Sequence, residues 1–220
     1  MKSEAGLETA VDFSEFGTQL RSLMAEWELS PLDQPVIEKF QAYLALILLW
    51  NSRMNLTGVR DPGGIVYRHF LESIACAQVL PPEISDLLDF GSGAGFPGIP
   101  VALCRPEIAV TLAESQLKKA AFLHEAVRVL GLKTRVFTGR AETLEIRFDC
   151  VALRAVDRME KAVSAASRLV RPEGVLVVMT TGAEFQAVKA AAGGVGVWER
   201  EVRIPGRSDQ VIAFGRMSSE

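Results

Sequence analysis

A glycine-rich segment near the middle of the chain has the residue types needed to hold a small charged ligand. The apolar run at residues 87–90 leads directly into residues 91–95, where every second residue is glycine. Glycine permits positive φ angles and a close approach of the backbone, and a helix that begins after such a loop offers free N–H groups to an anion. We predict a strand, a tight loop and a short helix at 99–104. Asp89 could accept a hydrogen bond from a ligand's ammonium group, beside the loop glycines Gly91, Gly93 and Gly95.

The spacing of these glycines separates two classes of cofactor site. A dinucleotide site has its third glycine three residues after the second, and Phe96 stands at that position here. The spacing G-x-G-x-G, preceded by an acidic residue on a strand, resembles the first motif of class I methyltransferases. A dinucleotide site and a structural turn remain the alternatives.

A second carboxylate lies where a ribose could be held. Glu114 follows Gly91 by 23 residues and ends the next apolar run, at residues 109–113. A carboxylate there suits two ribose hydroxyls, but dinucleotide-binding sheets use the same device, so it does not choose the cofactor. The alternative interpretation is a helix-capping carboxylate before Ser115 and Gln116.

Two later segments could complete the same crevice. Ala141 and Glu142 follow the third predicted strand, where an N–H and a carboxylate could address an adenine ring, although a solvated turn also explains them. Arg154 ends the next strand, at the carboxyl edge where open α/β sheets bind ligands. Its guanidinium could hold a methionine carboxylate or a substrate phosphate. It could equally pair with Asp149 or Asp157.

The predicted secondary structure that would position these residues changes near residue 80, from helices alone to alternating strands and helices. Before it, helical spacing of apolar residues is strong over 34–50 and weaker over 13–27 and 64–79, with a turn signal at 61–64. From residue 81, short apolar runs alternate with helical stretches, which predicts a parallel sheet with crossover helices. The predicted strands are 87–90, 109–113, 135–138, 150–153 and 175–179, with two more near 198–203 and 210–214.

The connection between the last two predicted strands is too short for a crossover helix, so these strands should pair antiparallel. A mostly parallel α/β sheet with an antiparallel last strand resembles the class I methyltransferase fold, which is Rossmann-like. We therefore predict an N-terminal helical extension at 1–80, packed on the core, and an S-adenosylmethionine-binding methyltransferase domain at 81–220.

Composition limits the setting in which the chain works. The 220 residues are 49% hydrophobic and 23% charged, which is enough for one sizeable core. The longest apolar run is far below the roughly 20 residues of a transmembrane helix, and the acidic start lacks a secretory signal, so we expect a cytoplasmic protein with no membrane partner. Three scattered cysteines and two histidines predict no metal site. The net charge of −3 means that any RNA binding must use a local patch.

Several stretches outside the generic motif occur together in a recognisable order. They are Trp50-Asn51, Asn55-Leu56-Thr57, Arg60-Asp61-Pro62, Arg68-His69-Phe70-Leu71-Glu72-Ser73, Gly95-Phe96-Pro97-Gly98-Ile99-Pro100, Glu114-Ser115, Lys118-Lys119, Phe122-Leu123, Arg140-Ala141-Glu142 and Arg154-Ala155. In this order and spacing, from about residue 44 to 178, the chain resembles the bacterial 16S ribosomal RNA guanine-N7 methyltransferases, also called glucose-inhibited division protein B.

The resemblance implies S-adenosylmethionine as cofactor and N7 of a guanine in 16S ribosomal RNA, or in the small ribosomal subunit, as acceptor. Because N7 carries a lone pair and no proton, transfer needs no general base, and we assign no catalytic residue. The resemblance implies that Gly91, Phe96, Ala141, Glu142 and Arg154 contact the cofactor, while Asp89, Gly93, Gly95 and Glu114 shape the pocket.

The substrate side is predicted from scattered polar and basic residues. The resemblance points to Asn55, Arg68, His69 and Lys118, and RNA could also be held by Arg53, Arg60, Lys119, Arg140 and Arg158. As alternatives, Asn55 caps a turn, and Arg68 and His69 lie on the outer face of a helix. Two departures from the family concern this side, namely Thr180-Thr181-Gly182 in place of a lysine before glycine and Ser208-Asp209-Gln210 in place of basic residues.

Three other functions remain open from the sequence. The chain could methylate a small molecule or a protein, could bind the cofactor at the ribosome without catalysis, or could bind a nicotinamide cofactor. We expect it to act as a monomer.

Overall fold

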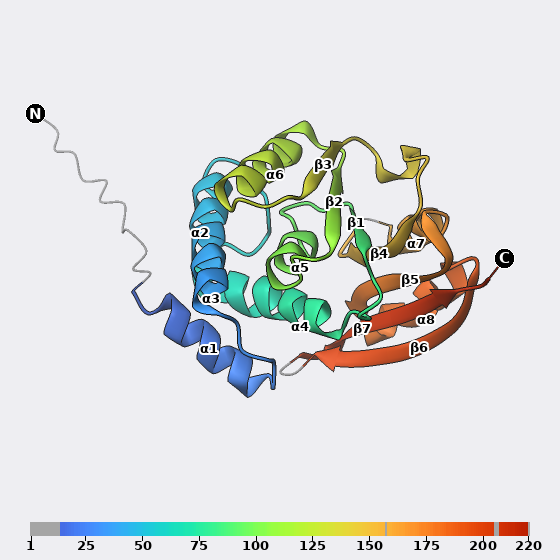
Figure 1. The fold of residues 1–220 in the computed structure, drawn as a ribbon, viewed down its shortest axis with the longest axis horizontal. Helices are drawn as coiled ribbons and strands as arrows, with labels where there is room; N and C mark the ends of the chain where they lie inside the picture. Colours follow the sequence, from blue (N-terminus) through green and yellow to red (C-terminus); the bar gives the residue numbers. More distant parts are fainter. Residues whose placement is uncertain (1–13, 157, 205–206, 220) are drawn as a thin grey trace, which may run out of the picture.

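The computed structural model describes residues 14–156, 158–204 and 207–219, and its centre is a seven-stranded sheet (Figure 1). The strand order is β3-β2-β1-β4-β5-β7-β6. Strands β1 to β5 pair in parallel, and β7 runs antiparallel to both β5 and β6. The strands are β1 (Asp86–Phe90), β2 (Ala109–Glu114), β3 (Arg135–Thr138), β4 (Phe148–Arg154), β5 (Val170–Thr181), β6 (Val195–Ile204) and β7 (Arg207–Met217).

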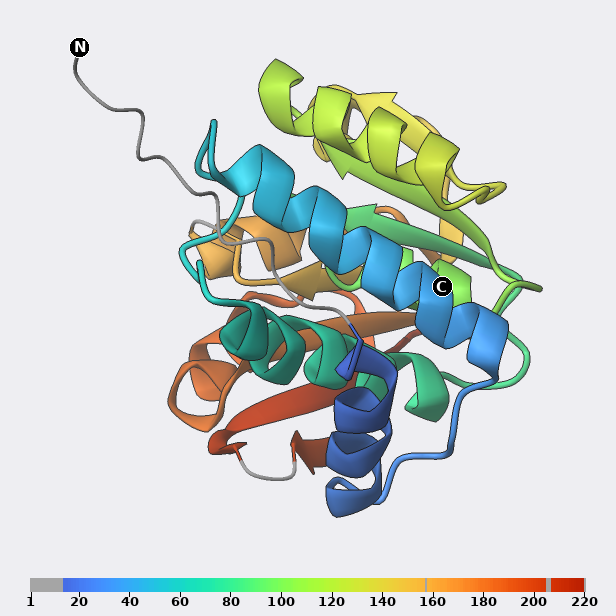
Figure 2. The same ribbon diagram turned by 90° about the vertical axis from the view of Figure 1, so that its left-hand side faces the viewer.

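Helices cover both faces of the sheet because its central strands bury side chains on both sides. Along β1, Leu87 packs in one apolar cluster and Leu88 in the other. One group of helices packs in the cluster of Leu87 and another in the cluster of Leu88, so that the sheet lies between them (Figures 1 and 2). The first group includes α2 (Gln34–Asn51), α4 (Leu71–Val79), α5 (Gly98–Cys104) and α6 (Leu117–Val129), and the second includes α7 (Met159–Ser167) and α8 (Gly182–Ala191).

The helices before residue 80 share their apolar core with the sheet. Phe40 of α2 and Leu20 of α1 (Phe16–Glu26) are fully buried in the same cluster as Leu112 of β2. The three helical segments predicted from periodicity are therefore present, and they share the apolar cluster on one side of the sheet. The domain boundary near residue 80 stays a prediction.

The chain over residues 62–79 is one continuous helical run with a π-helical turn inside it. It consists of α3 (Pro62–Ile65), the π-helical segment η1 (Val66–Phe70) and α4. The turn predicted at 61–64 was wrong, because this segment starts the helix. Asp61 accepts a hydrogen bond from the Gly64 N–H at 2.5 Å, and Pro62 occupies the first helical position, where its missing N–H costs nothing.

The antiparallel end of the sheet was predicted correctly. From β5 the chain passes through α8 to the edge strand β6 and returns as β7, which lies between β5 and β6. Within the described ranges, no helix combines the length and apolar character needed to cross a bilayer.

Candidate cofactor and RNA site

The glycine loop after β1 has the backbone conformation that its sequence predicts. Gly91, Gly93 and Gly95 have φ angles of +74°, +55° and +94°. The N–H groups of Gly91 and Ser92 both donate to the Ala113 carbonyl, at 3.0 and 2.9 Å, which ties the loop to the end of β2. A side chain at Gly91 would be disfavoured twice. The positive φ would strain it, and its Cβ would lie only 2.6 Å from a Val156 methyl carbon. The loop thus presents bare backbone at the carboxyl edge of the sheet.

Asp89 lies directly beneath this loop and is completely buried. Its Oδ2 accepts a hydrogen bond from the Gly98 N–H at 3.0 Å, and its Oδ1 has no partner within the described part of the chain. Burial raises the pKa of this carboxyl to about 7, against the lowering effect of the Gly98 N–H and Ser92. A buried acceptor without a donor is unfavourable. The ammonium group of a bound amino acid moiety would fit this oxygen, so the residues present are compatible with S-adenosylmethionine.

Glu114 braces the loop from the end of β2. It is nearly buried, and its two oxygens accept from the N–H groups of Gly93 at 2.9 Å and Gln116 at 2.7 Å. Gln116 is the residue before α6, so the capping interpretation describes one of these contacts. An ionised carboxylate has about four acceptor positions. It can therefore still accept from a ribose.

The segment after β3 is placed next to Glu114, and its carboxylate side chain is paired within the segment. The Gly139 N–H donates to the Glu114 carbonyl at 3.0 Å, and the buried Ala141 packs against the cluster that includes Ala113. Glu142 instead pairs with Arg140 at 2.5 Å. The pKa of Glu142 is lowered by a backbone hydrogen bond and by Arg140, so the carboxylate is charged.

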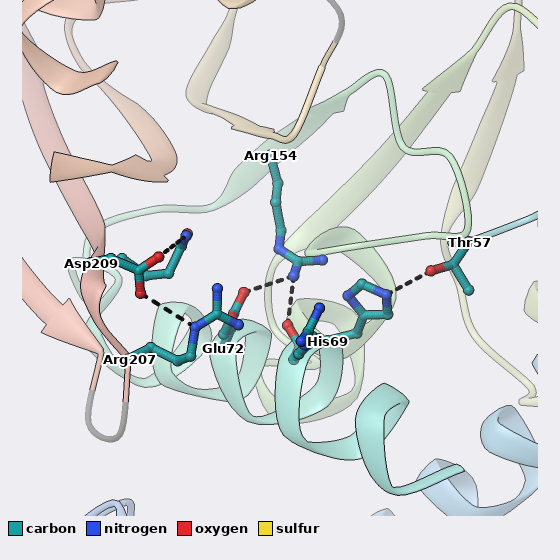
Figure 3. A network of polar contacts seen from close by, with 8 residues as sticks. Thr57, His69, Glu72, Arg154, Arg207 and Asp209 are labelled. Atoms are coloured by element: carbon teal, nitrogen blue, oxygen red, sulfur yellow. Dashed lines mark hydrogen bonds and ion pairs between the residues drawn. The ribbon is translucent and has the colours of Figure 1, made fainter. Parts of the chain in front are cut away.

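Arg154 at the end of β4 has a partner that the sequence did not predict. Its Nη2 donates to the Glu72 carboxylate at 2.7 Å and to the Arg68 carbonyl at 2.6 Å (Figure 3). The predicted partner Asp149 contacts Ser85 and Arg171 instead. The other candidate, Asp157, lies outside the described residues. The two side chains are 12% and 5% exposed, which makes Arg154–Glu72 a buried ion pair.

Glu72 also binds a second arginine. Its Oε1 accepts from Nη1 of Arg207, the first residue of β7, at 3.3 Å, and Arg207 in turn contacts Asp209 at 3.4 Å (Figure 3). One carboxylate on α4 thus joins the ends of β4 and β7. A sequence signal for this role existed, because an acidic residue within the otherwise apolar stretch 70–77 must be buried or paired.

His69 lies over the glycine loop rather than on an outer helix face. Its ring stacks on Phe96 with centroids 4.8 Å apart, and its Nε2 lies 2.7 Å from the Thr57 hydroxyl. Burial, followed by the nearby Arg154 charge, lowers the pKa of His69 to about 3, so the ring is neutral near pH 7. Phe96 in turn lies 5.8 Å from the Arg154 guanidinium carbon. These three side chains pack against one another beside the glycine loop and are called the wall below.

The other substrate candidates are not brought to the loop. Asn55 is exposed and accepts from Arg60 at 3.0 Å, whereas Asn51 holds the 56–59 turn through the N–H groups of Leu56 and Thr57. Lys118 is exposed in the first turn of α6. Arg68 is exposed, and only its carbonyl oxygen contacts Arg154.

Thr181, which departs from the family pattern, has a structural role. Its hydroxyl caps α8 by accepting from the Glu184 N–H at 3.2 Å, while Glu184 accepts from Thr180 and Thr181. The Thr181 hydroxyl thus satisfies one N–H group at the start of the helix. Among the described residues, no group of three or more His, Cys, Asp or Glu side chains could hold a metal ion.

A sheet of this order, with a glycine loop after its first strand, defines the class I S-adenosylmethionine-dependent methyltransferase fold. Solved structures share it. The T. thermophilus 16S rRNA N2 G1207 methyltransferase, solved with AdoMet and guanosine, is 18% identical with a TM-score of 0.53, covering 74% of this chain and 40% of that one. A SAM-dependent methyltransferase from Aquifex aeolicus is 16% identical with a TM-score of 0.56, covering 71% and 94%.

Sequence comparison then identifies the family. Residues 36–193 match the family described as rRNA small subunit methyltransferase G. The protein of that name from Roseiflexus castenholzii is 39% identical over 201 residues, with 86% of each chain covered, and the one from Roseiflexus sp. is 45% identical over 150 residues, covering 65% of this chain and 64% of that one. This chain belongs to that family. The predicted fold, family, enzyme class and cofactor are confirmed.

Proposed function

We propose that this chain methylates N7 of a guanine in 16S ribosomal RNA without a general base. The observation that carries the proposal is the lack of an available proton acceptor among the described side chains of the crevice. His69 has a pKa of about 3 and is held between Thr57 and Phe96. In the proposed complex the free oxygen of Asp89 receives the cofactor's ammonium group, and Glu114 accepts the ribose beside the N–H groups of Gly93 and Gln116, so neither carboxylate is left to take a proton. An acceptor atom with a lone pair and no proton matches such a site.

The bound cofactor supplies an electrophilic methyl group on a sulfonium sulfur. The chain's own residues hold its parts by ordinary polar chemistry. The loop backbone and the unpaired Asp89 Oδ1 suit the methionine moiety, Glu114 suits the ribose, and the Arg154 guanidinium suits a carboxylate. We assign cofactor binding to Asp89, Gly91, Gly93, Gly95, Phe96, Glu114, Ala141, Glu142 and Arg154.

Catalysis then rests on positioning and on exclusion of water. The Phe96, His69 and Arg154 wall is partly apolar and carries one fixed guanidinium, and it stands beside the loop. A guanine held against this wall would lie beside the loop that would bind the cofactor, which supplies proximity without proton transfer. The neutral His69 ring adds no charge to repel the sulfonium.

RNA would be held by cations that flank this edge of the sheet. Arg53, Lys118 and Lys119 have no carboxylate partner among the described residues, and neither does Arg68. By contrast, Arg140 is held by Glu142. We infer a local basic surface on an otherwise acidic chain, and a cytoplasmic monomer that acts on the small subunit or its RNA.

The pH dependence of single-turnover methylation tests the base-free mechanism. With the cofactor saturating, the rate should be flat between about pH 6.5 and 8.5, and His69→Gln should leave that shape unchanged. Because a base with a pKa of about 3 would also give a flat profile, the size of the rate decides. His69→Gln should keep the rate within about tenfold, and a loss of about 100-fold or more at unchanged cofactor and RNA affinity would show that His69 takes a proton.

A further inference from the structure

A hollow of about 310 Å³ lies between the end of α2 and the start of α6. None of its lining residues belongs to the glycine loop or to the wall beside it. They are Leu49, Trp50, Arg53, Met54, Lys118 and Ala121. The proposed cofactor contacts leave this hollow without a role.

One side of the hollow offers a fixed aromatic ring. Trp50 is half-buried and packs nearly perpendicular to Phe122, with ring centroids 5.7 Å apart and an interplanar angle of 72°. Next to it, Leu49 is 51% exposed, although many other large apolar side chains of this chain are buried. Exposed apolar surface with a polar rim is typical of contact sites.

The rim of the hollow carries two cationic side chains. Arg53 and Lys118 are exposed and form no ion pair among the described residues. Lys118 and Lys119 lie in the first turn of α6, which has no acidic residue. A helix dipole disfavours cations at this end, so helix stability does not explain their position. An anion bound from outside would offset that cost.

We propose that this hollow is a second RNA subsite that takes one unpaired nucleotide, with its base stacked on Trp50 and its phosphate between Arg53 and Lys118. The proposal rests on the proposed action on ribosomal RNA. Proteins hold unpaired RNA through this combination of aromatic stacking and cationic backbone contacts.

The subsite and the glycine loop are linked by a single rigid helix. Tyr43 of α2 donates a hydrogen bond to the Ala94 carbonyl of the loop, and Trp50 follows seven residues later, about 10 Å further along the helix axis. A single RNA segment can therefore contact both places. The subsite would hold the substrate at a fixed distance from the transfer site, so it contributes to the choice of guanine.

Four variants test the subsite. Trp50→Ala removes the ring, and Trp50→Phe keeps an aromatic face in the same packing. The double variant Arg53→Ala/Lys118→Ala removes the cations of the rim. The matched control Lys133→Ala/Arg135→Ala removes two exposed cations at the start of β3, at the end of the sheet where the parallel strands begin. The Kd for a 16S ribosomal RNA fragment and for small subunits from cells lacking this protein is measured over a series of KCl concentrations. S-adenosylhomocysteine affinity is measured in parallel.

Trp50→Ala should weaken RNA binding roughly 5- to 100-fold, as expected for the loss of one stacked base, while Trp50→Phe stays within about threefold. The cation variant should lower the slope of log Kd against log salt by about 0.7, the value for one phosphate of single-stranded RNA, and the control should not. S-adenosylhomocysteine affinity should be unchanged in all four.

Three results would overturn the subsite. These are RNA binding by Trp50→Ala within twofold of wild type, equal losses for Trp50→Ala and Trp50→Phe, or a loss seen only with protein-bearing subunits, which would indicate that the hollow contacts a protein. Each leaves the proposed function standing, because wild-type protein would still form 7-methylguanine. Absence of that product fails the proposed function instead.

Discussion

The carboxylate of Glu72 and the guanidinium of Arg154 form a buried ion pair, with 2.7 Å between Oε2 and Nη2, although 82 residues separate them in the sequence. The pair fixes the end of β4 against the helix that carries His69. Since Arg207 shares the same carboxylate, the start of β7 is fixed to that helix as well.

Breaking the pair should cost far more stability than breaking an exposed one. Glu72→Ala leaves two guanidiniums in a poorly hydrated site, and removal of one partner from a buried pair typically costs about 3–5 kcal/mol. A double-mutant cycle by urea unfolding, with Glu72→Ala and Arg154→Ala, should therefore give a large coupling energy. The Arg140–Glu142 pair, in which the side chains are 74% and 32% exposed, is the control and should give less than about 1 kcal/mol. Equal coupling in the two cycles would contradict a stabilising role for Glu72.

The burial of His69 should make stability depend on pH. Its folded pKa of about 3 lies below the unfolded value near 6.5, so the unfolded chain binds the extra proton as the pH falls. The stability that this neutral ring contributes is present above pH 6.5 and is lost progressively toward pH 3. Relative to His69→Gln, wild type should lose about 2 kcal/mol between pH 7.5 and 5, measured by urea unfolding. Comparison with the variant is necessary because Asp89, whose pKa is raised by burial, changes the stability with pH in the opposite direction in both proteins. Parallel curves for the two proteins would show that the ring is not protected from protons.

Cofactor affinity should rise through the pKa of Asp89. Because burial raises that pKa to about 7, the carboxyl is largely protonated at pH 6, and an ammonium group prefers the ionised form. The Kd of S-adenosylhomocysteine by calorimetry should fall about tenfold from pH 6 to pH 8, since binding to the ionised form alone changes tenfold per unit below the pKa. Asp89→Asn should bind weakly, with little change over this range. A steep pH dependence that survives in Asp89→Asn would assign the effect to another group.

A side chain added at Gly91 should prevent the glycine loop from taking its observed conformation without unfolding the protein. Gly91→Ala places a Cβ 2.6 Å from Val156 at a φ of +74°. Gly131→Ala is the control, because its φ of +61° imposes similar strain while nothing lies within 4 Å of the new Cβ. Both should lose about 1–2 kcal/mol of stability from the left-handed conformation, but Gly91→Ala alone should lose measurable S-adenosylhomocysteine binding in calorimetry. Wild-type affinity in Gly91→Ala would show that the loop is not the cofactor site.

Local chemistry explains why much of the fold was predictable. The strand, loop and helix around Gly91 follow from an apolar run, three alternating glycines and the residues after them, all within a few positions. The antiparallel end followed from the length of one connection. The start of the helix at Pro62 was misread because proline and glycine signal both turns and helix starts, and only the Asp61 cap decides between them.

The contacts that the sequence did not predict are those between distant segments. Arg154 was placed correctly at the edge of the sheet, but its partner Glu72 depends on how α4 packs against β4. A turn cap was the alternative role for Asn55, but the turn N–H groups are bound by Asn51, a residue of the same type four positions earlier, for which no role was predicted from the sequence. Glu142 was assigned to an adenine contact, and its pairing with Arg140 depends on side-chain orientation, which spacing does not determine.

The most direct measurement is the identity of the methylated nucleotide. Small ribosomal subunits from cells lacking this protein are incubated with it and with isotope-labelled S-adenosylmethionine, and the 16S RNA is digested and analysed by mass spectrometry. The proposed function predicts one labelled product, 7-methylguanosine, at a single position. Label on another atom or base, or tight cofactor binding with no labelled RNA, would contradict it.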